Sequence, residues 1–485
     1  MAKDNSIGKQ FINGEFVEGK GKEFDNFNPA TEEVISRYSS ASLEQVNEAV
    51  DVAEEAQKKW AKLPAIERAR YLRKVSEKMR EKREELATVL SKDQGKIFKE
   101  AIDEIDGSAE YVDYMAEWAR RIEGEIVESD RPNENIFLYR EPIGVVAGII
   151  PWNYPVFVFM RKFAPALVAG DTVVIKPSSE TPDIIYELTK IIAGVGLPGG
   201  VANVIFGSGG VVGNALVKNR KVGFVSFTGS VETGEEIMKL AASNVTKVSL
   251  ELGGKAPAIV MDDADLESTL KYVLASRILD AGQVCNAAER LYVQEGIADK
   301  FVSKLADRMR AIKVGNPIDK GVEMGPLVSS SQREKVSSMV EKAVHEGAKV
   351  VVGGHSTAVN GKGYFYEPTL IEGVSQDSEI MRKEVFGPVL PVKTFKTLSE
   401  AIEYANDCDY GLTSSIYTQN LDAAMRAANE LRFGETYINR EHWEAIQGFH
   451  AGWRRSGIGG DDGKHGFEEF FNTHIVYVQY NTEKQ

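Results

Sequence analysis

Apolar residues recur at helical spacing between residues 42 and 81, after a first segment of short, strand-like runs such as KQFINGEFVEGKG. Ser42 and Gln45 fit a capping box at the start of the first helix. One face of that helix is formed by Leu43, Val46, Val50, Ala53 and Trp60. A second amphipathic helix follows, with a core-facing stripe of Ile66, Ala69, Leu72, Val75 and Met79.

From Pro142 to Met261 the pattern changes to short apolar runs separated by helical stretches. The runs are IGVVAGII at 143–150, TVVIK at 172–176, ANVIF at 202–206, VGFVSF at 222–227 and KVSLEL at 247–252. Strands that alternate with helices predict a parallel sheet, whose ligands bind at the carboxyl ends of the strands. The alternation resumes after Cys285 with RLYVQ and ADKFVSKLADRMRAI, which predicts a second α/β domain over about 252–455.

Two segments alternate apolar and polar residues without an obvious place in either sheet. They are EGEIVESDRPNENIFLY, within 121–140, and HIVYVQY near the carboxyl terminus. As edge strands they predict subunit contacts by strand addition, whereas the alternative is a simple surface hairpin.

Length, charge and cysteine content exclude several classes of function. The 485 residues suffice for two or three domains, and 58 Lys and Arg against 72 Asp and Glu give a net charge of −14. Nucleic acids and anionic membranes favour basic surfaces, so we expect neither as a partner. Two cysteines, Cys285 and Cys408, cannot build a disulfide framework or a four-thiolate zinc site, and the six histidines show no metal-ligand spacing. We expect no metal.

The amino-terminal MAKDNSIGKQFINGEF lacks the apolar core of a secretory signal, which favours a cytoplasmic location. Residues 142–160 form a run of 19 residues without a charge, nearly long enough to span a membrane. Pro151, Asn153 and Pro155 would break such a helix at its centre. A buried strand followed by a rigid turn is the better interpretation.

Four positions carry candidate chemistry. In VSFTGSVETGEEIM, a strand meets glycines before a helix, so backbone amides could face a phosphate, although the same glycines also suit an ordinary turn. Cys285, in GQVCNAAER, is either a nucleophilic thiol or a small buried apolar residue.

Glu251 leaves an apolar strand just before two glycines, where desolvation would raise its pKa and suit a general base; the alternative is a helix cap or an ion pair. Asn153, held between two prolines in PWNYP, could donate to an oxyanion or simply satisfy its own turn.

Taken in order, PWNYP, KPSSETP, FTGS, LELGGKAP, GQVCNAAER and EVFGPV resemble the aldehyde dehydrogenase superfamily over nearly the whole chain. The glutamate and the cysteine of its signatures are 34 positions apart, at 251 and 285. DYMAEWARRIEGEIVESDRP and the tail from GETYINREHWEAIQGFH look most like the lactaldehyde and glycolaldehyde dehydrogenases, which oxidise short 2-hydroxyaldehydes.

The resemblance implies a catalytic set and a fold. Cys285 would attack the aldehyde, Asn153 and the Cys285 backbone N–H would hold the oxyanion, and Glu251 would activate water to release the acid from a thioester. The fold would comprise a cofactor-binding domain (1–120 and 143–251), a catalytic domain (252–455) and a small β element for oligomerisation (121–142 and 456–485). A homodimer or a homotetramer would assemble through that element.

The resemblance also implies NAD or NADP as cofactor. Lys176 would contact the adenosine ribose, Ser230 the pyrophosphate, and Glu384 with Phe386 the nicotinamide riboside. The full implied cofactor set is Pro151, Trp152, Lys176, Ser179, Gly229, Ser230, Gly234, Leu252, Glu384 and Phe386. Many NAD-specific members carry glutamate where this chain has Ser179, so NADP should be admitted, although Glu180 could partly substitute.

Residues that match the hydroxyaldehyde-oxidising pattern would select the substrate: Arg161, Asn286, Glu444 and His450. Two alternatives remain for these side chains, since Arg161 could merely pair with an acid and His450 could be structural. A rival activity is the oxidation of succinate or glutarate semialdehyde, with Arg161 on the distal carboxylate. A rival of another class is a catalytically silent structural protein, which the joint presence of Cys285, Glu251 and Asn153 argues against.

Overall fold

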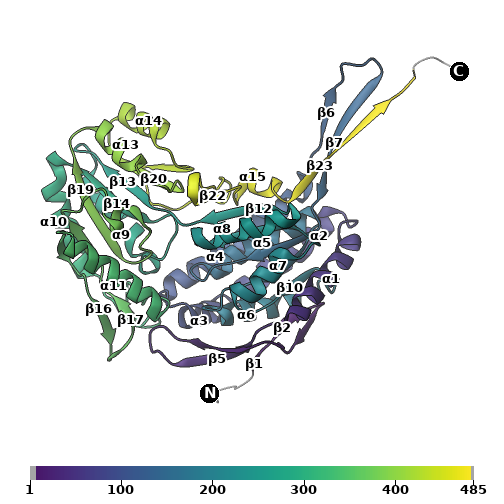
Figure 1. Ribbon diagram of the computed structural model, residues 1–485, viewed down its shortest axis with the longest axis horizontal. Coiled ribbons are helices and arrows are strands. Elements are labelled where there is room, and N and C mark those ends of the chain that lie inside the picture. The colour runs from purple at the N-terminus through teal and green to yellow at the C-terminus, as the bar shows by residue number, and fades with distance from the viewer. Residues whose placement is uncertain (1–6, 482–485) are drawn as a thin grey trace.

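The computed structural model describes residues 7–481, and two large sheets flanked by helices confirm the predicted α/β class (Figure 1). The first sheet has eight strands, of which the five central ones are parallel. Its order is β22 (Gly457–Ile458), β12 (Lys247–Leu252), β11 (Val222–Gly229), β8 (Val145–Ile149), β9 (Thr172–Lys176), β10 (Ala202–Val204), β2 (Gln10–Ile12) and β3 (Glu15–Val17).

Strand order in this sheet reverses between β8 and β11. From β8 the chain adds β9 and then β10 on one side, and it then returns to add β11 and β12 on the other. Such a reversal opens a crevice at the carboxyl ends of the two strands beside it. The residues that follow β8 and β11 are therefore placed to bind a ligand.

Helices cover both faces of the first sheet. The capping box at Ser42 is confirmed: the Gln45 amide donates to Ser42 Oγ at 3.3 Å and the Ser42 amide donates to Gln45 Oε1 at 3.1 Å. The helices are α1 (Leu43–Trp60), α2 (Ala65–Glu81), α3 (Arg83–Asp93), α4 (Phe98–Glu117), α5 (Pro155–Ala169), α6 (Pro182–Gly194), α7 (Asn214–Lys218) and α8 (Val231–Ala241).

The uncharged run at 142–160 is folded into the core. It forms β8, a turn, and the first part of α5, which begins with Pro155 in its first turn and ends at Gly170 in the left-handed conformation (φ 107°). Every residue of α5 is buried. Across residues 7–481, no helix combines the length and the apolar character that a bilayer crossing requires.

The second sheet has seven strands and supplies the cysteine. Its order is β15 (Lys349–Val352), β18 (Thr369–Glu372), β19 (Val389–Phe395), β14 (Ala288–Gln294), β13 (Ala256–Val260), β20 (Thr413–Tyr417) and β21 (Glu435–Ile438). Only β15 runs antiparallel to its neighbour. The associated helices are α9 (Leu266–Ile278), α10 (Glu295–Ala311), α11 (Ser330–His345), α12 (Glu379–Arg382), α13 (Leu398–Asn406) and α14 (Leu421–Glu430).

Three smaller sheets complete the described chain. A three-stranded arm, β6 (Glu125–Glu128), β7 (Glu134–Pro142) and β23 (Phe471–Gln479), projects from the body (Figure 1). It joins the two alternating segments of the sequence, because β23 pairs with β7 over nine residues. The others are β1 (Ile7–Gly8) with β4 (Glu23–Phe27) and β5 (Val34–Ser39), and the hairpin of β16 (Ser356–Val359) and β17 (Lys362–Tyr366).

The tail is divided differently from the expected boundary at 456. The short β22 pairs antiparallel with β12 in the first sheet, and α15 (Gly463–Glu468) carries Phe467 into the core beside that sheet. Within the described part of the tail, the arm takes up β23, Phe471–Gln479. The expectations for the amino terminus and the tail include residues 1–6 and 482–485, which lie outside the described residues.

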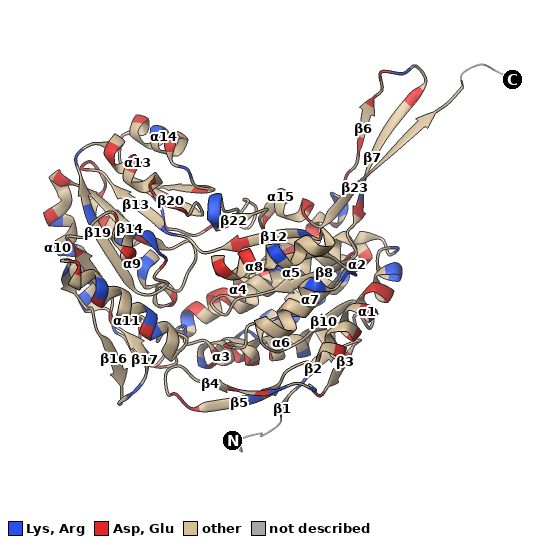
Figure 2. Cartoon of the chain, in the orientation of Figure 1, with Lys and Arg blue, Asp and Glu red and all other residues tan. Residues whose placement is uncertain are grey.

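Figure 2 shows acidic and basic positions interspersed along the outer helices, without separation by sign. Several are neighbours on one helix, as in the pairs Lys58–Glu55 and Arg70–Glu67. On the helices seen in this view, acidic residues are thus accompanied by basic ones.

Candidate active site

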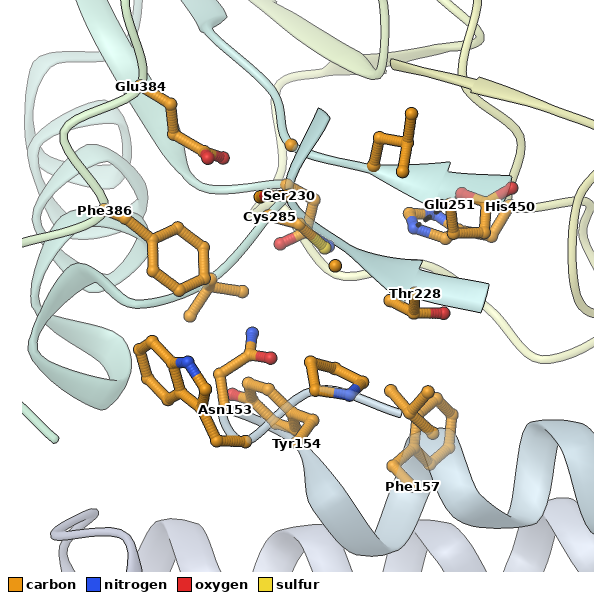
Figure 3. Close-up of a pocket in the computed structure, with 18 of the residues that line it drawn as sticks. Asn153, Tyr154, Phe157, Thr228, Ser230, Glu251, Cys285, Glu384, Phe386 and His450 are labelled. Carbon is orange, nitrogen blue, oxygen red and sulfur yellow. Dashed lines mark ion pairs between the residues drawn. The ribbon is translucent and has the colours of Figure 1, made fainter. Parts of the chain in front are cut away.

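A cavity of about 210 Å³ lies between the carboxyl ends of β8, β11 and β12 and the segment that precedes β14 (Figure 3). Fourteen of the seventeen predicted site residues line it: Pro151, Trp152, Asn153, Arg161, Gly229, Ser230, Glu251, Leu252, Cys285, Asn286, Glu384, Phe386, Glu444 and His450. Lys176, Ser179 and Gly234 are not among its lining residues. The strand reversal in the first sheet thus coincides with the predicted chemistry.

Asn153 is held rigidly in the turn between β8 and α5. Its side chain is 6% exposed, and its Nδ2 donates to the carbonyl of Gln283 at 2.9 Å. Gln283 is two residues before Cys285, so this bond fixes the amide beside the cysteine segment. The second N–H of Nδ2 remains for a ligand in the cavity.

Cys285 follows a tightly bonded loop. Gln283 donates through Nε2 to the Asp280 carbonyl at 2.9 Å and accepts the Val328 amide at 2.9 Å. Gly254, two residues after β12, lies close to the cysteine backbone. A Cβ at this position would be only 2.7 Å from the Cys285 carbonyl oxygen, so the close approach requires glycine. In Figure 3, Cys285 lies between the Glu251–His450 pair on one side and Glu384 with Phe386 on the other.

Glu251, the penultimate residue of β12, has a buried carboxylate. Both of its oxygens lack a hydrogen-bond partner among the described residues, and Oε2 lies 3.7 Å from His450 Nε2. Burial raises the pKa of Glu251 well above its usual range, and the nearby His450 offsets only part of that shift. A carboxylate in this state can accept a proton from water near neutral pH.

His450 is an ion-paired histidine. Its Nδ1 lies 2.5 Å from Glu435 Oε1, and the side chain is 2% exposed. Burial alone would lower the pKa of His450, but Glu444 and Glu435 outweigh it and raise the pKa well above its usual value. The ring therefore bridges the Glu435 carboxylate and Glu251.

Arg161, Glu444 and Asn286 form a polar wall of the cavity. Arg161 binds Asp462 through Nε at 2.9 Å and Nη2 at 2.5 Å, and Nη2 also donates to Glu444 Oε1 at 2.9 Å. Asn286 Nδ2 donates to Glu444 Oε2 at 2.5 Å, while its buried Oδ1 accepts no hydrogen bond from any described residue. The arrangement leaves an unpaired acceptor next to the cysteine.

Aromatic and acidic groups close the opposite side. Phe386 has a left-handed backbone (φ 56°), which Gln332 supports by donating to its carbonyl at 2.7 Å. The rings of Phe386 and Trp152 meet edge to face at 5.4 Å. Glu384 Oε1 accepts the Gly254 amide at 2.9 Å, and burial raises the pKa of Glu384 to about 7.

The residues present fit a dinucleotide. Ser230 caps α8, so the first amides of that helix and the exposed Ser230 hydroxyl are available to a phosphate. A Cβ at Gly234 would lie 2.6 Å from a methyl group of Leu252, so a larger residue there would require the Leu252 side chain to move. The Glu384 carboxylate can accept hydrogen bonds from the hydroxyl groups of a ribose.

Lys176 is the last residue of β9 and Ser179 follows that strand, and neither lines the cavity. Lys176 is buried, donates through Nζ to the Pro177 carbonyl at 2.7 Å, and has its pKa lowered to about 8 by desolvation. Ser179 donates to the Gly207 carbonyl at 3.3 Å. Neither side chain contacts a carboxylate among the hydrogen bonds and ion pairs of residues 7–481.

Nine further residues line the cavity that the sequence analysis did not single out. Tyr154, Phe157 and Val158 come from the turn and α5, Thr228 and Gly253 from the first-sheet strands, Val284 from the cysteine loop, Gln332 and Lys335 from α11, and Trp443 from the loop after β21. Tyr154, Thr228, Gly253, Val284 and Trp443 lie within motifs quoted above and could have been found there, whereas Gln332 and Lys335 of α11 lie in none of them. Within the described chain, no group of His, Cys, Asp and Glu side chains is arranged to hold a metal ion.

Comparison with known proteins gives consistent matches over nearly the whole chain. The model of the aldehyde dehydrogenase family matches residues 16–476. Lactaldehyde dehydrogenase of Escherichia coli (strain K12) is 55% identical over 471 residues, 97% of this chain and 98% of that protein. A crystal structure of the E. coli enzyme superposes with a TM-score of 0.96, covering 98% of this chain and 99% of that one.

Two further relatives differ in the cofactor that their descriptions name. D-glyceraldehyde dehydrogenase (NADP(+)) of Thermoplasma acidophilum is 39% identical over 98% of this chain and 96% of its own length. Betaine aldehyde dehydrogenase from Staphylococcus aureus, solved in complex with NAD+, is 38% identical, with a TM-score of 0.96 over 99% of this chain and 97% of that one.

Proposed function

The chain belongs to the aldehyde dehydrogenase family and is an oxidoreductase that uses a nicotinamide cofactor, and we propose that it oxidises short 2-hydroxyaldehydes to 2-hydroxy acids. Lactaldehyde and glycolaldehyde are the substrates we expect. Two relatives, lactaldehyde dehydrogenase and D-glyceraldehyde dehydrogenase, support this substrate class, because both aldehydes carry a hydroxyl on the carbon next to the carbonyl.

Cys285 forms the covalent bond in the proposed mechanism. Its sulfur attacks the carbonyl carbon, and the negative oxygen that results accepts hydrogen bonds from the free N–H of Asn153 Nδ2 and from the Cys285 backbone amide. A nicotinamide cofactor held by these residues would supply the acceptor for the hydride that leaves that carbon. Pro151, Trp152 and Phe386 exclude water on the cofactor side, and Glu384 orients the riboside.

Glu251 releases the product. Its buried carboxylate, which accepts no hydrogen bond from a described residue, takes a proton from a water molecule, whose oxygen attacks the thioester carbon while the Cys285 sulfur leaves. The base favours hydrolysis over transfer of the acyl group to another thiol.

The unpaired Asn286 Oδ1 carries the substrate proposal. A 2-hydroxyl can donate to this buried acceptor, whereas a plain alkyl aldehyde leaves it unsatisfied at a cost of about 1–3 kcal/mol. His450 and Glu444 add polar partners, and a cavity of about 210 Å³ suits a short chain. In this proposal Arg161 acts mainly by orienting Glu444, with which it is paired.

The semialdehyde alternative is less well supported by the same contacts. A distal substrate carboxylate would need the Arg161 guanidinium, which Asp462 and Glu444 already occupy. The carboxylate would also approach two negative charges in a buried site.

We propose that both cofactors are used. Gly229, Ser230 and Gly234 at the start of α8 suit the pyrophosphate, and Lys176 suits the adenosine ribose. Ser179 brings no negative charge against a 2′-phosphate, while Glu180 lies one position later. Residues 1–120 and 143–251 would carry this site, and 252–455 the cysteine.

The projecting arm supports assembly into a homodimer or homotetramer. Its sheet has β6 and β23 as free edges, and six large apolar side chains on it are exposed: Ile126, Val127, Tyr139, Ile475, Tyr477 and Val478.

A substrate panel with NAD and NADP tests the proposal. We expect kcat/KM for lactaldehyde and glycolaldehyde to exceed that for propanal and for succinate semialdehyde by about tenfold or more. Equal efficiency for propanal, or a preference for the semialdehyde, would overturn the substrate assignment. A kcat/KM for NADP a hundredfold below that for NAD would overturn dual use, on the scale of about 2.7 kcal/mol.

A further inference from the structure

A buried ion pair lies directly behind Asn153, outside the cavity. Lys96 and Glu104 have fully buried side chains, and Lys96 Nζ lies 2.6 Å from Glu104 Oε2. The same ammonium group donates to the backbone carbonyl of Asn153 at 2.7 Å and lies 3.7 Å from the centre of the Tyr154 ring. The lysine thus holds the backbone of the residue whose amide faces the substrate.

Glu104 secures the other end of the same turn. Its Oε1 accepts the amide of Val156 at 2.9 Å and that of Phe157 at 3.3 Å. These are free amides of the first turn of α5, which has no side-chain cap of its own. Together the pair fixes the backbone on both sides of Tyr154.

The cluster also reaches the cysteine segment. Lys96 Nζ lies 3.9 Å from Asp280 Oδ2, and Asp280 is held by Gln94 Nε2 at 2.8 Å and 3.0 Å. Asp280 has a left-handed backbone (φ 50°), which costs free energy for a residue other than glycine and persists only where the surroundings enforce it. The Asp280 carbonyl accepts hydrogen bonds from the backbone amide and from Nε2 of Gln283, and the Gln283 carbonyl in turn accepts one from Asn153 Nδ2.

A fully buried charge pair is a poor source of stability, because desolvation offsets most of the attraction. We propose that Lys96 and Glu104 are positioning residues, which set the direction of the Asn153 amide toward the oxyanion that forms on the aldehyde bound to Cys285. The inference rests on the proposed function of Asn153. Lys96 is not among the residues that line the cavity, so in this proposal it acts through the Asn153 backbone.

A double-mutant cycle on the acylation step tests this role. Single-turnover hydride transfer would be followed in the full-length protein for wild type, Lys96→Met, Asn153→Ala and the double variant, with lactaldehyde and saturating NAD. We expect Lys96→Met to slow acylation about tenfold or more, since small displacements of a positioned group have large effects on rate. In the Asn153→Ala background the same change should alter the rate by less than about twofold.

Two further variants control for folding. Glu104→Gln keeps the size of the side chain and an oxygen that can accept the two backbone amides, but it removes the negative charge that faces Lys96. If Lys96→Met yields no folded protein, the double-mutant cycle can be measured with Glu104→Gln in its place. Arg68 is the matched control, because it is buried and donates to the Val168 and Ala169 carbonyls at the opposite end of α5. Arg68→Met should lower the melting temperature and leave acylation by folded enzyme within about twofold of wild type.

The outcomes separate the two proposals. An equal slowing by Lys96→Met in both backgrounds, or no slowing in the wild-type background, overturns the positioning role while leaving the proposed function intact. A wild-type acylation rate in Asn153→Ala alone overturns the oxyanion assignment and the positioning role with it. Absence of aldehyde oxidation in the unmodified enzyme overturns the proposed function itself.

Discussion

A carboxylate introduced at position 179 should separate the two cofactors. Ser179 is partly buried three residues after Lys176, and its hydroxyl is engaged only by the Gly207 carbonyl at 3.3 Å. Lys176 pairs with no carboxylate among the described residues, and its pKa is lowered to about 8 by burial. If the adenosine ribose binds beside Lys176 as we propose, Ser179→Glu would add a negative charge next to the 2′-phosphate of NADP.

The magnitude follows from the charge separation. Two unit charges about 4 Å apart at an effective dielectric constant of about 20 interact by about 4 kcal/mol. Because Ser179 is partly solvated, screening reduces this to about 1.5–3 kcal/mol. The kcat/KM for NADP should fall by about 10- to 150-fold, since 1.4 kcal/mol corresponds to a factor of ten.

Steady-state kinetics with each cofactor at fixed lactaldehyde measures the effect. NAD should be used with nearly unchanged kcat/KM, because its ribose hydroxyls can donate to the new carboxylate. Ser179→Gln is the size-matched neutral control and Glu180→Gln the control for the neighbouring charge. An unchanged NADP to NAD ratio in Ser179→Glu, or an equal loss in Ser179→Gln, would refute the electrostatic reasoning.

Three other predictions concern the cofactor, the substrate and the assembly. Burial raises the pKa of Glu384 to about 7, so fluorescence titration should show NAD binding that tightens as the pH rises through 7 and the carboxylate ionises; Glu384→Gln should abolish that dependence, and its persistence would argue against the role. Asn286→Ala should lower kcat/KM for lactaldehyde by about 10- to 100-fold but that for propanal only a few-fold, and equal losses would contradict the hydroxyl contact. Aspartate at both Ile126 and Tyr477 should shift the sedimentation of the protein toward monomer, whereas an unchanged oligomer would exclude the arm as the interface.

Local features of the fold were predictable from the sequence. The Ser42–Gln45 capping box and the strand at 247–252 formed as expected, because their determinants lie within a few residues of one another. The run at 202–206 forms a shorter strand, Ala202–Val204. The two-residue β22 has no apolar run to reveal it and exists only because Gly457 and Ile458 reach the edge of β12.

The interior of the site depends on contacts that are distant in sequence. Lys96 and Asn153 are 57 positions apart, and Gln94 and Asp280 are 186 apart. A lysine beside a helix is usually solvent-exposed, so nothing in GKIFKEA marks Lys96 as buried. Likewise, the pairing of Arg161 with Asp462 spans 301 positions and could be proposed only as one of two alternatives.

The most direct test of the covalent mechanism is the mass of Glu251→Gln after incubation with lactaldehyde and NAD. With acylation intact and the general base removed, the protein should release one burst of reduced cofactor and gain one lactoyl group, located on Cys285 by peptide mapping, while Cys285→Ser gains none. An unmodified protein, an acyl group on another residue, or undiminished steady turnover in Glu251→Gln would contradict the roles assigned to Cys285 and Glu251.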